Sequence, residues 1–510
     1  MALASLLRSI PSHRALRRPF VSPYSLALLG VLVLPFLLAA PFLNEPFEKD
    51  EGTYATVARG LLDGQLPYRD LFDHKPPLVY VWYAVSFLLF GENVWAPRIL
   101  AAFSWSATTA LVWVLTARFR GEVAALASAI LCAAFSGIVL LQANANTEVF
   151  TVLPLIASLY AFARAREQRD VRWFLAAGAL GGVAALTKQV AATNLIALAA
   201  FLLWIHRSEI GVALRGLAWM TAGALAALGV ALVPFVLTSS TSDFFYATVH
   251  YNQLYSDSLS LHDRYLFALR NVPYSVNASL LPIALVVAAL WDLRSRRIDP
   301  FDQLSMLSLA AAGAGTVLSG FFFPHYFVVL LPSAAIFGGP LLVKLAANLR
   351  HQPVLLAVVL VTSAFTVAAN LPAFTASSPE ARHAVKFPAI GQAERENSSD
   401  VVAAAIRALS RPEDTIYNYG RETQLYFYAN RAPAIPQLYD RVFLLDPATL
   451  PEAMSALTAD PPRIIVDTAN HAEPRPAVKT FPDALQALLA SRYDLVQELP
   501  YADIYLLRSP

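Results

Sequence analysis

Residues 24–54 have the sequence YSLALLGVLVLPFLLAAPFLNEPFEKDEGTY, in which an apolar run ending near Leu43 is followed directly by charged side chains. An apolar run of this length is sufficient for a helix that crosses the hydrocarbon core of a bilayer. Arginines precede the run, as they precede the apolar part of a signal peptide, but that part is normally shorter. We therefore expect an uncleaved first transmembrane helix, with residues 1–23 in the cytoplasm.

The remainder of the chain has the same apolar character. Of the 510 residues, 57% are hydrophobic and 15% are charged, which is too little charge for the surface of soluble domains. Two short apolar segments meet at Lys188, so they could be tilted or re-entrant. The sequence predicts an α-helical polytopic membrane protein. Its spanning segments, about eleven in all, lie near 24–43, 97–117, 122–142, 147–163, 172–187, 189–205, 212–237, 273–291, 303–320, 325–343 and 353–372.

The loops between these segments indicate the orientation of the chain. If the N-terminus is cytoplasmic and the further apolar run 76–90 does not cross the membrane, every cytoplasmic loop is basic. If that run did cross, the arginine-rich loops would face outwards. We therefore expect it to lie in the outer interface, where Tyr80, Trp82 and Tyr83 suit the headgroup level, with a buried or spanning helix as the alternative. The basic loop residues are Arg118, Arg120, Arg164, Arg166, Arg169, Arg172, Arg207, Arg215, Arg294, Arg296, Arg297, Lys344 and Arg350.

The composition changes after the last apolar segment. Residues 374–510 contain many charges and prolines, so we expect an extracytoplasmic α/β domain that follows a membrane domain of residues 24–373. Short strands are expected near 415–419, 463–467 and 504–507, and amphipathic helices near 398–410 and 483–491.

Several kinds of site and partner are not supported by the sequence. The net charge is +2 and the basic residues form short clusters, so a nucleic-acid partner is not expected. Cys132 is the only cysteine, which excludes an intrachain disulfide and a thiolate-rich metal site. No glycine-rich phosphate loop is present, so a nucleotide-linked donor is not favoured.

Charged residues are concentrated in the outer loop, residues 44–97. A charge near the hydrocarbon is costly, at about 2.5–3.5 kcal/mol each at the bilayer centre, which favours a functional role for such a cluster. A solvated loop between helices is also expected to be polar. The loop contains Glu48-Lys49-Asp50-Glu51-Gly52-Thr53-Tyr54, then Pro67-Tyr68-Arg69-Asp70, then Asp73-His74-Lys75-Pro76-Pro77.

The order of these motifs resembles that of the C-type (GT-C) membrane glycosyltransferases. The pair Asp50-Glu51 directly follows a transmembrane helix, Tyr54 comes three residues later, Lys75-Pro76-Pro77-Leu78 follows, and Glu148 comes after the third helix. The protein O-mannosyltransferases and the aminoarabinose transferases of bacterial lipid A are the most similar families. The resemblance covers residues 24–345 and is strongest in 48–100. It implies a polyprenyl-phosphate sugar donor, a glycan, lipid or protein acceptor, and no cofactor.

The resemblance also implies roles for individual residues. Asp50 corresponds to the base, Glu51 would orient it or bind the sugar, and Glu148 matches a second outer acid that many relatives supply as aspartate. Cations that relatives place near the lipid-linked phosphate correspond to Lys75 and Lys188, although Lys188 could also be an ordinary snorkelling lysine. His74 and Arg69 are further candidates for the phosphate. Tyr54, Tyr68, His325 and Tyr326 are candidates for substrate binding, with a structural interface role as the alternative for the His-Tyr pair.

The expected chemistry requires these residue types. A polyprenyl phosphate is a good leaving group, so transfer needs a carboxylate that takes the proton of the acceptor and cations that neutralise the departing phosphate. A single displacement inverts the anomeric carbon, as the resemblance also implies. No metal is required. Metal ligation stays open because Asp50, Glu51, Glu148 and His262 could face one cavity, although no His or Cys spacing favours it.

Other functions explain the sequence less well. A transporter or flippase would place charges near the midplane and show paired broken helices, whereas these acids cluster at one face. Polysaccharide ligases and polymerases more often depend on outer-loop arginines, and a non-catalytic scaffold would not need these charges. The low lysine content and high alanine, arginine and proline content are typical of a GC-rich bacterial source. We therefore expect the bacterial inner membrane, with the active site outside the cytoplasm and an undecaprenyl or decaprenyl carrier.

Overall fold

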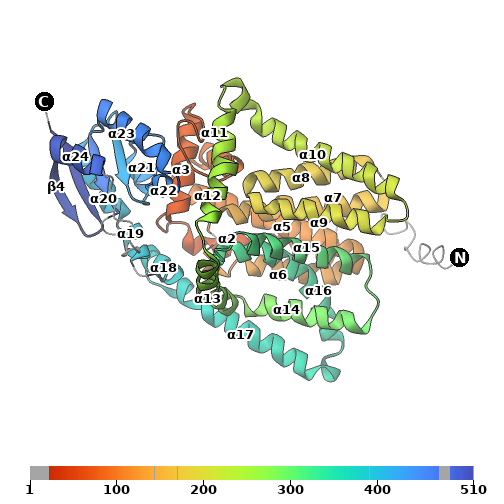
Figure 1. Cartoon of the computed structure of the whole chain (residues 1–510). Coiled ribbons are helices and arrows are strands. Elements are labelled where there is room, and N and C mark those ends of the chain that lie inside the picture. The colour runs from red at the N-terminus through yellow and green to blue at the C-terminus, as the bar shows by residue number, and fades with distance from the viewer. Residues whose placement is uncertain (1–21, 143, 169, 390, 470–482, 509–510) are drawn as a thin grey trace.

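The computed structural model describes residues 22–142, 144–168, 170–389, 391–469 and 483–508. The predictions for residues 1–21 and for Arg169 lie outside this part of the chain. A bundle of helices makes up most of the molecule, and a small domain that contains a β-sheet lies at one end of it (Figure 1).

The bundle consists of helices that follow the predicted apolar segments. They are α2 (Pro23–Ala39), α5 (Trp95–Arg120), α6 (Glu122–Phe135), α7 (Thr147–Gln168), α8 (Val171–Thr187), α9 (Ala192–Ile205), α10 (Ile210–Leu237), α14 (Leu280–Asp292), α15 (Pro300–Leu318), α16 (Leu331–Ala347) and α17 (Pro353–Thr375). As predicted, two short helices meet at Lys188, where an extended residue separates α8 from the 3-10 turn η4 (Gln189–Ala191).

Not all of these helices are long enough to cross a membrane alone. In the described part of the chain, six helical segments satisfy both length and hydropathy, and one bent pair would make a seventh. They are Pro23–Phe42, Trp95–Arg120, Thr147–Gln168, Ile210–Leu237, Pro324–Ala347 and Pro353–Thr375. The expected number of about eleven spanning helices therefore stays a prediction.

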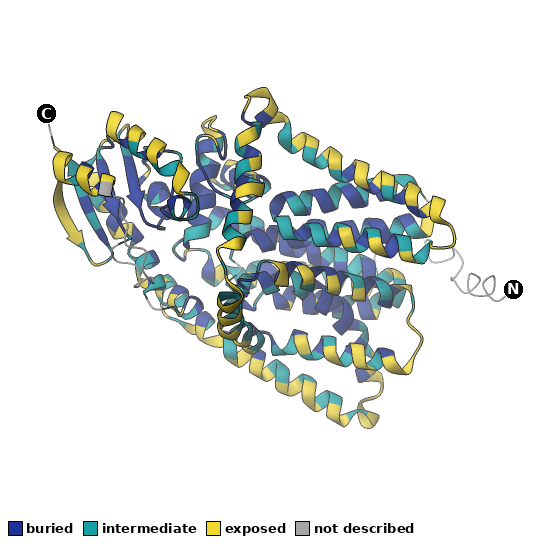
Figure 2. Cartoon of the chain, in the orientation of Figure 1, coloured by how far each residue is buried: buried dark blue, intermediate teal, exposed yellow. Residues whose placement is uncertain are grey.

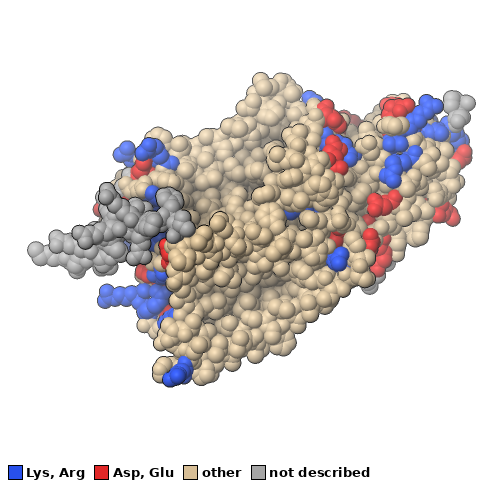
Figure 3. Space-filling view, turned by 180° about the vertical axis from the view of Figure 1, so that it is seen from behind, with Lys and Arg blue, Asp and Glu red and all other residues tan. Residues whose placement is uncertain are grey.

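Three helices expose apolar faces that water would not cover favourably. In the most apolar part of α2, α10 and α17, only 11%, 17% and 11% of the residues are buried, against 78% for α7 (Figure 2). Seen from behind, the middle of the molecule shows few Lys, Arg, Asp or Glu side chains, and these gather toward the two ends (Figure 3). Contiguous apolar surface of this extent indicates contact with lipid, so the chain is an integral membrane protein.

The basic loops lie together at the end of the bundle opposite the small domain. Arg120 at the end of α5 pairs with Asp299 and Asp302 at the start of α15, at 2.6 and 2.8 Å. Arg296 also pairs with Asp302, at 2.5 Å. These contacts join loops that were all predicted to be cytoplasmic. Which side of the membrane they occupy stays a prediction.

One predicted helix is interrupted. The apolar run 273–291 was expected to form a single helix, but α13 (Leu261–Ala278) ends within it, and the next segment, which begins with α14, is bent from α13 by 86°. Ser279 between them has non-helical dihedral angles (φ −133°, ψ 38°), and its hydroxyl donates to the carbonyl oxygen of Ser275 at 2.5 Å. The local hydrogen bond competes with the helical pattern at this point.

The small domain is an α/β domain with a five-stranded sheet in the order β2-β1-β3-β5-β4. β1 pairs in parallel with β2 and β3, whereas β5 is antiparallel to β3 and β4. The predicted strands and helices are confirmed within one or two residues, whereas β2 and β4 were not predicted. The elements are α18 (Pro379–Lys386), α19 (Gln392–Asn397), α20 (Ser399–Leu409), β1 (Thr415–Tyr419), α21 (Gln424–Ala429), β2 (Ala432–Pro433), α22 (Arg441–Leu445), α23 (Leu450–Ala459), β3 (Ile464–Asp467), α24 (Asp483–Arg492), β4 (Tyr493–Leu499) and β5 (Ala502–Leu507).

The predicted outer loop 44–97 lies between the bundle and the small domain. It contains α3 (Lys49–Leu62) and α4 (Leu78–Phe90). α4 has 13 residues, about 20 Å of helix, which is less than the hydrocarbon thickness of about 30 Å. It therefore does not span the membrane alone, and its position in the interface stays a prediction.

The small domain packs directly on this loop. α3 contacts α21, and the backbone amide of Phe72 donates to the carbonyl oxygen of Pro436 at 2.8 Å. The first turn of α3 therefore lies where the two parts of the protein meet.

Candidate active site

The start of α3 separates the two adjacent acids. Glu48 caps the helix, and its backbone amide donates to a carboxylate oxygen of Glu51 at 3.5 Å, which turns Glu51 inwards. Glu51 is fully buried, whereas the side chain of Asp50 keeps 32% of its surface exposed. Asp50 is therefore the acid of this pair that can reach a ligand.

Asp50 forms an ion pair with Lys75. The carboxylate oxygen Oδ2 of Asp50 lies 3.7 Å from Nζ of Lys75. Burial acts to raise the pKa of Asp50, but the positive charges of Lys75 and Lys49 outweigh it and hold this pKa below its usual value. Burial opposes the charged form of Lys75, and the negative charge of Asp50 nevertheless raises its pKa. Asp50 is thus a carboxylate at neutral pH, as a proton acceptor must be.

The second acid also lies beside a cation. Glu148, in the first turn of α7, is fully buried, accepts a hydrogen bond from Thr147 Oγ1 at 2.8 Å and forms an ion pair with Lys188. Nε2 of His325 is 3.9 Å from Oε1 of Glu148. The ammonium of Lys188 is 3.8 Å from the ring centroid of Tyr326, a favourable cation–π contact. The fold therefore brings together four candidates that are distant in sequence.

The two groups of charges are neighbours. His325 lies close enough to Asp50 to interact with it electrostatically, and Tyr326 is in the same relation to Lys75. His325 and Tyr326 lie on η7 (Pro324–Leu330), the 3-10 turn that leads into α16. We call Asp50, Lys75, Glu148, Lys188, His325 and Tyr326 the charged cluster.

An apolar cleft leads away from this cluster. It is partly open and lies between α7, α9, α15 and the start of α16. Its polar end is formed by Glu148, Lys188 and Tyr326, and its apolar walls include Val152, Leu155, Ile156, Val190, Ala311, Ala312 and Val329. The hydroxyls of its threonines Thr151, Thr193 and Thr316 all donate to backbone carbonyls. The cleft thus suits a long apolar ligand with an anionic head.

The segment that carries Lys75 is held in place from both sides. Tyr68 and Tyr80 donate hydrogen bonds to the backbone carbonyl oxygen of Lys75, at 2.8 and 3.3 Å. Tyr80 also donates to Asp73 Oδ2 at 2.8 Å, and Tyr439 of the small domain donates to Oδ1 at 3.1 Å. Burial favours the protonated form of Asp73, but hydrogen bonds from neighbours that include His74 lower its pKa to about 2. Tyr68 therefore supports Lys75 through the backbone.

His74 connects three parts of the structure. Its ring nitrogen Nδ1 lies 3.1 Å from the hydroxyl of Tyr439, and its ring stacks on Tyr255 at 5.0 Å between centroids. Its carbonyl oxygen accepts hydrogen bonds from Asn252 and Gln189, at 2.7 and 3.2 Å. Burial lowers the pKa of His74, which makes it a poor cation for a phosphate.

Glu51 and Tyr54 lie beneath the charged cluster. Glu51 accepts two hydrogen bonds from Arg98, at 2.7 and 3.3 Å, and one from the backbone amide of Ala145 at 3.0 Å. Tyr54 is fully buried, and its hydroxyl lies 3.4 Å from Oδ1 of Asn146. Both residues are occupied by protein partners.

One predicted candidate lies apart from the cluster. Arg69 is exposed and pairs with its neighbour Asp70 at 2.7 Å, and no contact of the described residues joins it to Asp50 or Lys75. The described residues contain no group of three or more His, Cys, Asp or Glu side chains that could hold a metal ion. The four residues considered for a metal site therefore do not form one there: Asp50, Glu51, Glu148 and His262.

Sequence reasoning missed two residues that shape the site. Arg98 donates to Glu51 and to the backbone carbonyls of Phe42, Leu43, Glu45 and Pro46. The sequence signal that could have identified Arg98 was its position as a single arginine at the start of an apolar segment, because a charge there usually has a structural or functional role. Tyr439, which contacts Asp73 and His74, carries no such signal because it lies in a loop far along the chain.

Parts of the sequence and the overall fold resemble those of known proteins. Residues 74–238 match a family model described as dolichyl-phosphate-mannose-protein mannosyltransferase. No curated protein sequence matches the chain. The fold is similar to ArnT from Cupriavidus metallidurans bound to undecaprenyl phosphate, with a TM-score of 0.54 and 18% identity, covering 94% of this chain and 97% of that chain. It is also similar to the archaeal oligosaccharyltransferase AglB from Archaeoglobus fulgidus, in complex with an inhibitory peptide and a dolichol-phosphate.

The second likeness has a TM-score of 0.50 and 12% identity, and it covers 87% of this chain and 69% of AglB. The apo form of the same ArnT matches as well, with a TM-score of 0.54 and 17% identity, covering 94% of this chain and 97% of that chain. The expected C-type fold is confirmed.

Proposed function

We propose that this chain, a C-type membrane glycosyltransferase by its fold and its family match, transfers a sugar from a polyprenyl-phosphate carrier to an acceptor at the outer face of the membrane. One observation carries the proposal: an apolar cleft ends at Lys188, Glu148 and Tyr326, beside the Asp50–Lys75 ion pair. A prenyl chain fits the apolar walls, and its phosphate fits the cations. The similar ArnT structure holds undecaprenyl phosphate, and the similar AglB structure holds a dolichol-phosphate.

Asp50 acts as the general base in this scheme. It takes the proton of the acceptor while the acceptor atom attacks the anomeric carbon of the donor sugar. The bond between that carbon and the phosphate oxygen breaks, and the oxygen leaves with the bonding electrons. Attack opposite the leaving group inverts the anomeric configuration.

The cations act on the leaving group. Negative charge grows on the phosphate oxygen as the bond breaks, and Lys75 and Lys188 neutralise it. Glu148 fixes Lys188 through their ion pair, and Tyr326 fixes it through its ring. Glu148 therefore contributes to donor binding through Lys188. Glu51 acts as a positioning residue because its oxygens are already occupied by Arg98 and Ala145.

The orientation follows from charge. The site and the small domain lie at the end of the bundle opposite the basic loops, and basic loops normally remain in the cytoplasm. We therefore place the site and residues 374–510 outside the cytoplasm, in the inner membrane of a bacterium. A glycan, a lipid or a protein can serve as acceptor in this scheme.

The decisive experiment compares the wild type with Asp50→Asn, purified in detergent. Release of polyprenyl phosphate is measured from a panel of polyprenyl-phosphate sugars mixed with cell-envelope acceptors. Asp63→Asn is the matched control, since Asp63 caps the far end of the same helix and is exposed. Release by the wild type and Asp63→Asn, but not by Asp50→Asn, supports the proposal. A folded wild type that releases nothing from any donor refutes it and favours a transporter or flippase.

A further inference from the structure

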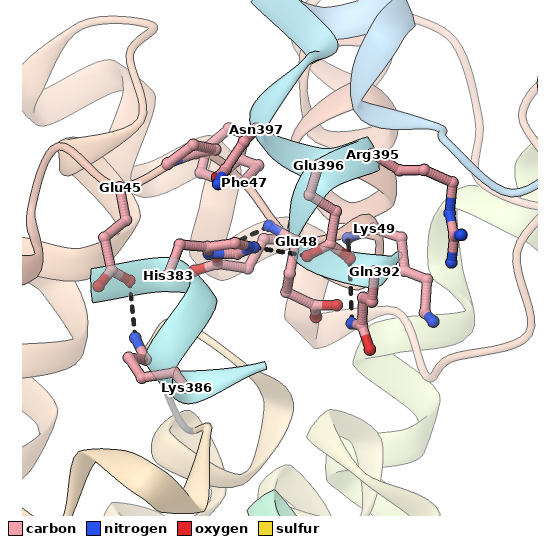
Figure 4. Close-up of polar contacts among 12 residues, drawn as sticks. Glu45, Phe47, Glu48, Lys49, His383, Lys386, Gln392, Arg395, Glu396 and Asn397 are labelled. Atoms are coloured by element: carbon pink, nitrogen blue, oxygen red, sulfur yellow. Dashed lines mark hydrogen bonds and ion pairs between the residues drawn. The ribbon is translucent and has the colours of Figure 1, made fainter. Parts of the chain in front are cut away.

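Lys386 is a fully buried lysine at the end of α18, the first helix after α17. Its Nζ donates to Oε2 of Glu45 at 2.7 Å and to Oδ1 of Asn144. The amide Nδ2 of Asn144 in turn donates to the same Oε2 of Glu45, at 3.1 Å. The three side chains close a ring of hydrogen bonds between segments that are distant in sequence. We call α18 and α19 the linker, and Lys386, Glu45 and Asn144 the linker clamp. Figure 4 shows the ion pair of this clamp, Lys386 with Glu45.

The clamp joins the two segments that carry the acids of the charged cluster. Glu45 lies shortly before Asp50, and Asn144 lies shortly before Glu148. The backbone of Lys386 reinforces the contact, since its carbonyl oxygen accepts a hydrogen bond from Gln142 at 2.6 Å. Lys386 therefore contacts both the segment that precedes Asp50 and the segment that precedes Glu148.

A second contact of the same linker reaches the start of α3. Nε2 of His383, one turn before Lys386, lies 2.5 Å from Oε2 of Glu396 on α19. The other oxygen of Glu396 accepts the backbone amide of Lys49 at 3.4 Å. Figure 4 shows Lys386 and His383 leaving α18 toward these different partners, Glu45 and Glu396. The linker therefore contacts the segment before Asp50 at both of its ends.

From these contacts we infer that Lys386 is a positioning residue, which fixes the segments of Asp50 and Glu148 relative to each other. Glu45 and Lys386 are both fully buried, so each charge depends on the other. A displacement of about 1 Å between groups that act on one ligand is enough to lower a rate about 100-fold. The predicted effect on kcat rests on the proposed function. The predicted effect on hydrogen–deuterium exchange of segments 44–51 and 144–148 does not.

The test uses the full chain, three variants and four measurements. Lys386→Met removes the charge and keeps the length, and Glu45→Gln/Lys386→Met removes both charges. Lys344→Met is the matched control, because it breaks an exposed ion pair with Asp292 at the opposite end of the bundle. For each protein, kcat and KM for the donor, the melting temperature, and hydrogen–deuterium exchange of segments 44–51 and 144–148 are measured.

We expect Lys386→Met to lower kcat about 100-fold, with a change of less than about threefold in KM for the donor. Exchange should rise in both segments. The double variant should regain most of the lost melting temperature, because no buried charge is left unpaired, but its kcat should stay at least about tenfold below that of the wild type. Lys344→Met should match the wild type in all four measurements.

Two results would overturn the inference. A double variant that regains kcat together with melting temperature would show that the pair only stabilises the fold. Unchanged exchange of both segments in Lys386→Met would show that Lys386 does not hold them, whatever the activity. If the wild type releases no polyprenyl phosphate, the proposed function fails, and the exchange measurement still decides whether the clamp exists.

Discussion

Oδ2 of Asp50 lies 3.7 Å from Nζ of Lys75, although one residue begins α3 and the other lies in the irregular segment before α4. Lys75 therefore has two roles. It keeps Asp50 ionised before the reaction, and its ammonium group can turn to the phosphate when the donor is bound. Substitutions can test these two roles separately.

Replacing Lys75 with methionine should change the pH dependence of the reaction. Lys75 lowers the pKa of Asp50, so its removal should raise that pKa. The acidic limb of kcat/KM, where Asp50 becomes protonated, should therefore move to higher pH, and the maximal rate should fall about 100-fold. Lys75→Arg should keep the acidic limb in place. A pH profile of Lys75→Met that is lower but unshifted would contradict the role of Lys75 toward Asp50.

Filling the apolar cleft should affect donors according to the length of their prenyl chain. Ala312 on α15 lines the cleft, and phenylalanine there would occupy space that we assign to the chain. Each CH₂ kept out of an apolar site forfeits about 0.8 kcal/mol, so KM for a long-chain donor should rise at least tenfold in Ala312→Phe. KM for a short, water-soluble donor should change little.

Ala310→Phe is the control for this experiment, because Ala310 lies on the same helix and is exposed. Equal losses for long and short donors in Ala312→Phe would mean that the cleft does not hold the chain.

Breaking the buried pair of Glu51 and Arg98 should destabilise the protein. Both side chains are at most 3% exposed, so Glu51→Gln leaves a buried guanidinium without its counter-charge, at a cost of about 3–5 kcal/mol. Glu167→Gln, at a partly exposed pair with Arg118, should cost about 0–1 kcal/mol. Thermal unfolding in detergent measures both. Similar melting temperatures for the two variants would argue against a structural role for Glu51.

The same pair predicts how stability depends on pH. Burial acts to raise the pKa of Glu51, but the charge and hydrogen bonds of Arg98 outweigh it and lower that pKa in the folded state. The contribution of Glu51 to stability is therefore complete above the unfolded carboxyl pKa of about 4.3 and is lost as the pH falls through the folded value. The melting temperature of the wild type should therefore lie above that of Glu51→Gln at neutral pH. The difference between the two melting temperatures should become smaller as the pH is lowered, and any reversal of their order should occur only on the acidic side of that pKa.

Local patterns in the sequence were enough to locate the main elements. Apolar runs marked the helices of the bundle, the single Lys188 marked the break between α8 and η4, and short apolar runs marked β1 and β3. The motif around Asp50 and Lys75 led to residues that do lie together. Each of these signals lies within a short stretch of chain, which is why the sequence alone carries it.

Contacts between distant segments could not be predicted in the same way. Asp50 and Glu51 are adjacent and chemically similar, and the buried contact of Glu51 with Arg98, 47 residues away, helps to hold Glu51 inwards and leaves Asp50 exposed. Lys386 and Tyr439 act across separations of more than 240 residues, from segments whose own sequence shows no periodic or motif signal. The bend at Ser279 lies inside an apolar run and is accompanied by one local hydrogen bond.

Adding a methyl group at Gly52 should test whether the small domain must pack on α3. A Cβ atom at Gly52 would lie 2.4 Å from Cβ of Gln424 on α21, so alanine forces the two helices apart. Elsewhere a glycine-to-alanine change within a helix stabilises by about 1 kcal/mol, and Gly30 on α2 has no neighbour within 4 Å of such an atom. Gly30→Ala should therefore keep or raise the melting temperature. Gly52→Ala should lower it, by about 1–3 kcal/mol in unfolding free energy, and should lower kcat because Asp50 lies two residues before the displaced contact. A Gly52→Ala protein that melts at or above the wild-type temperature would mean that α3 and α21 are not in close contact.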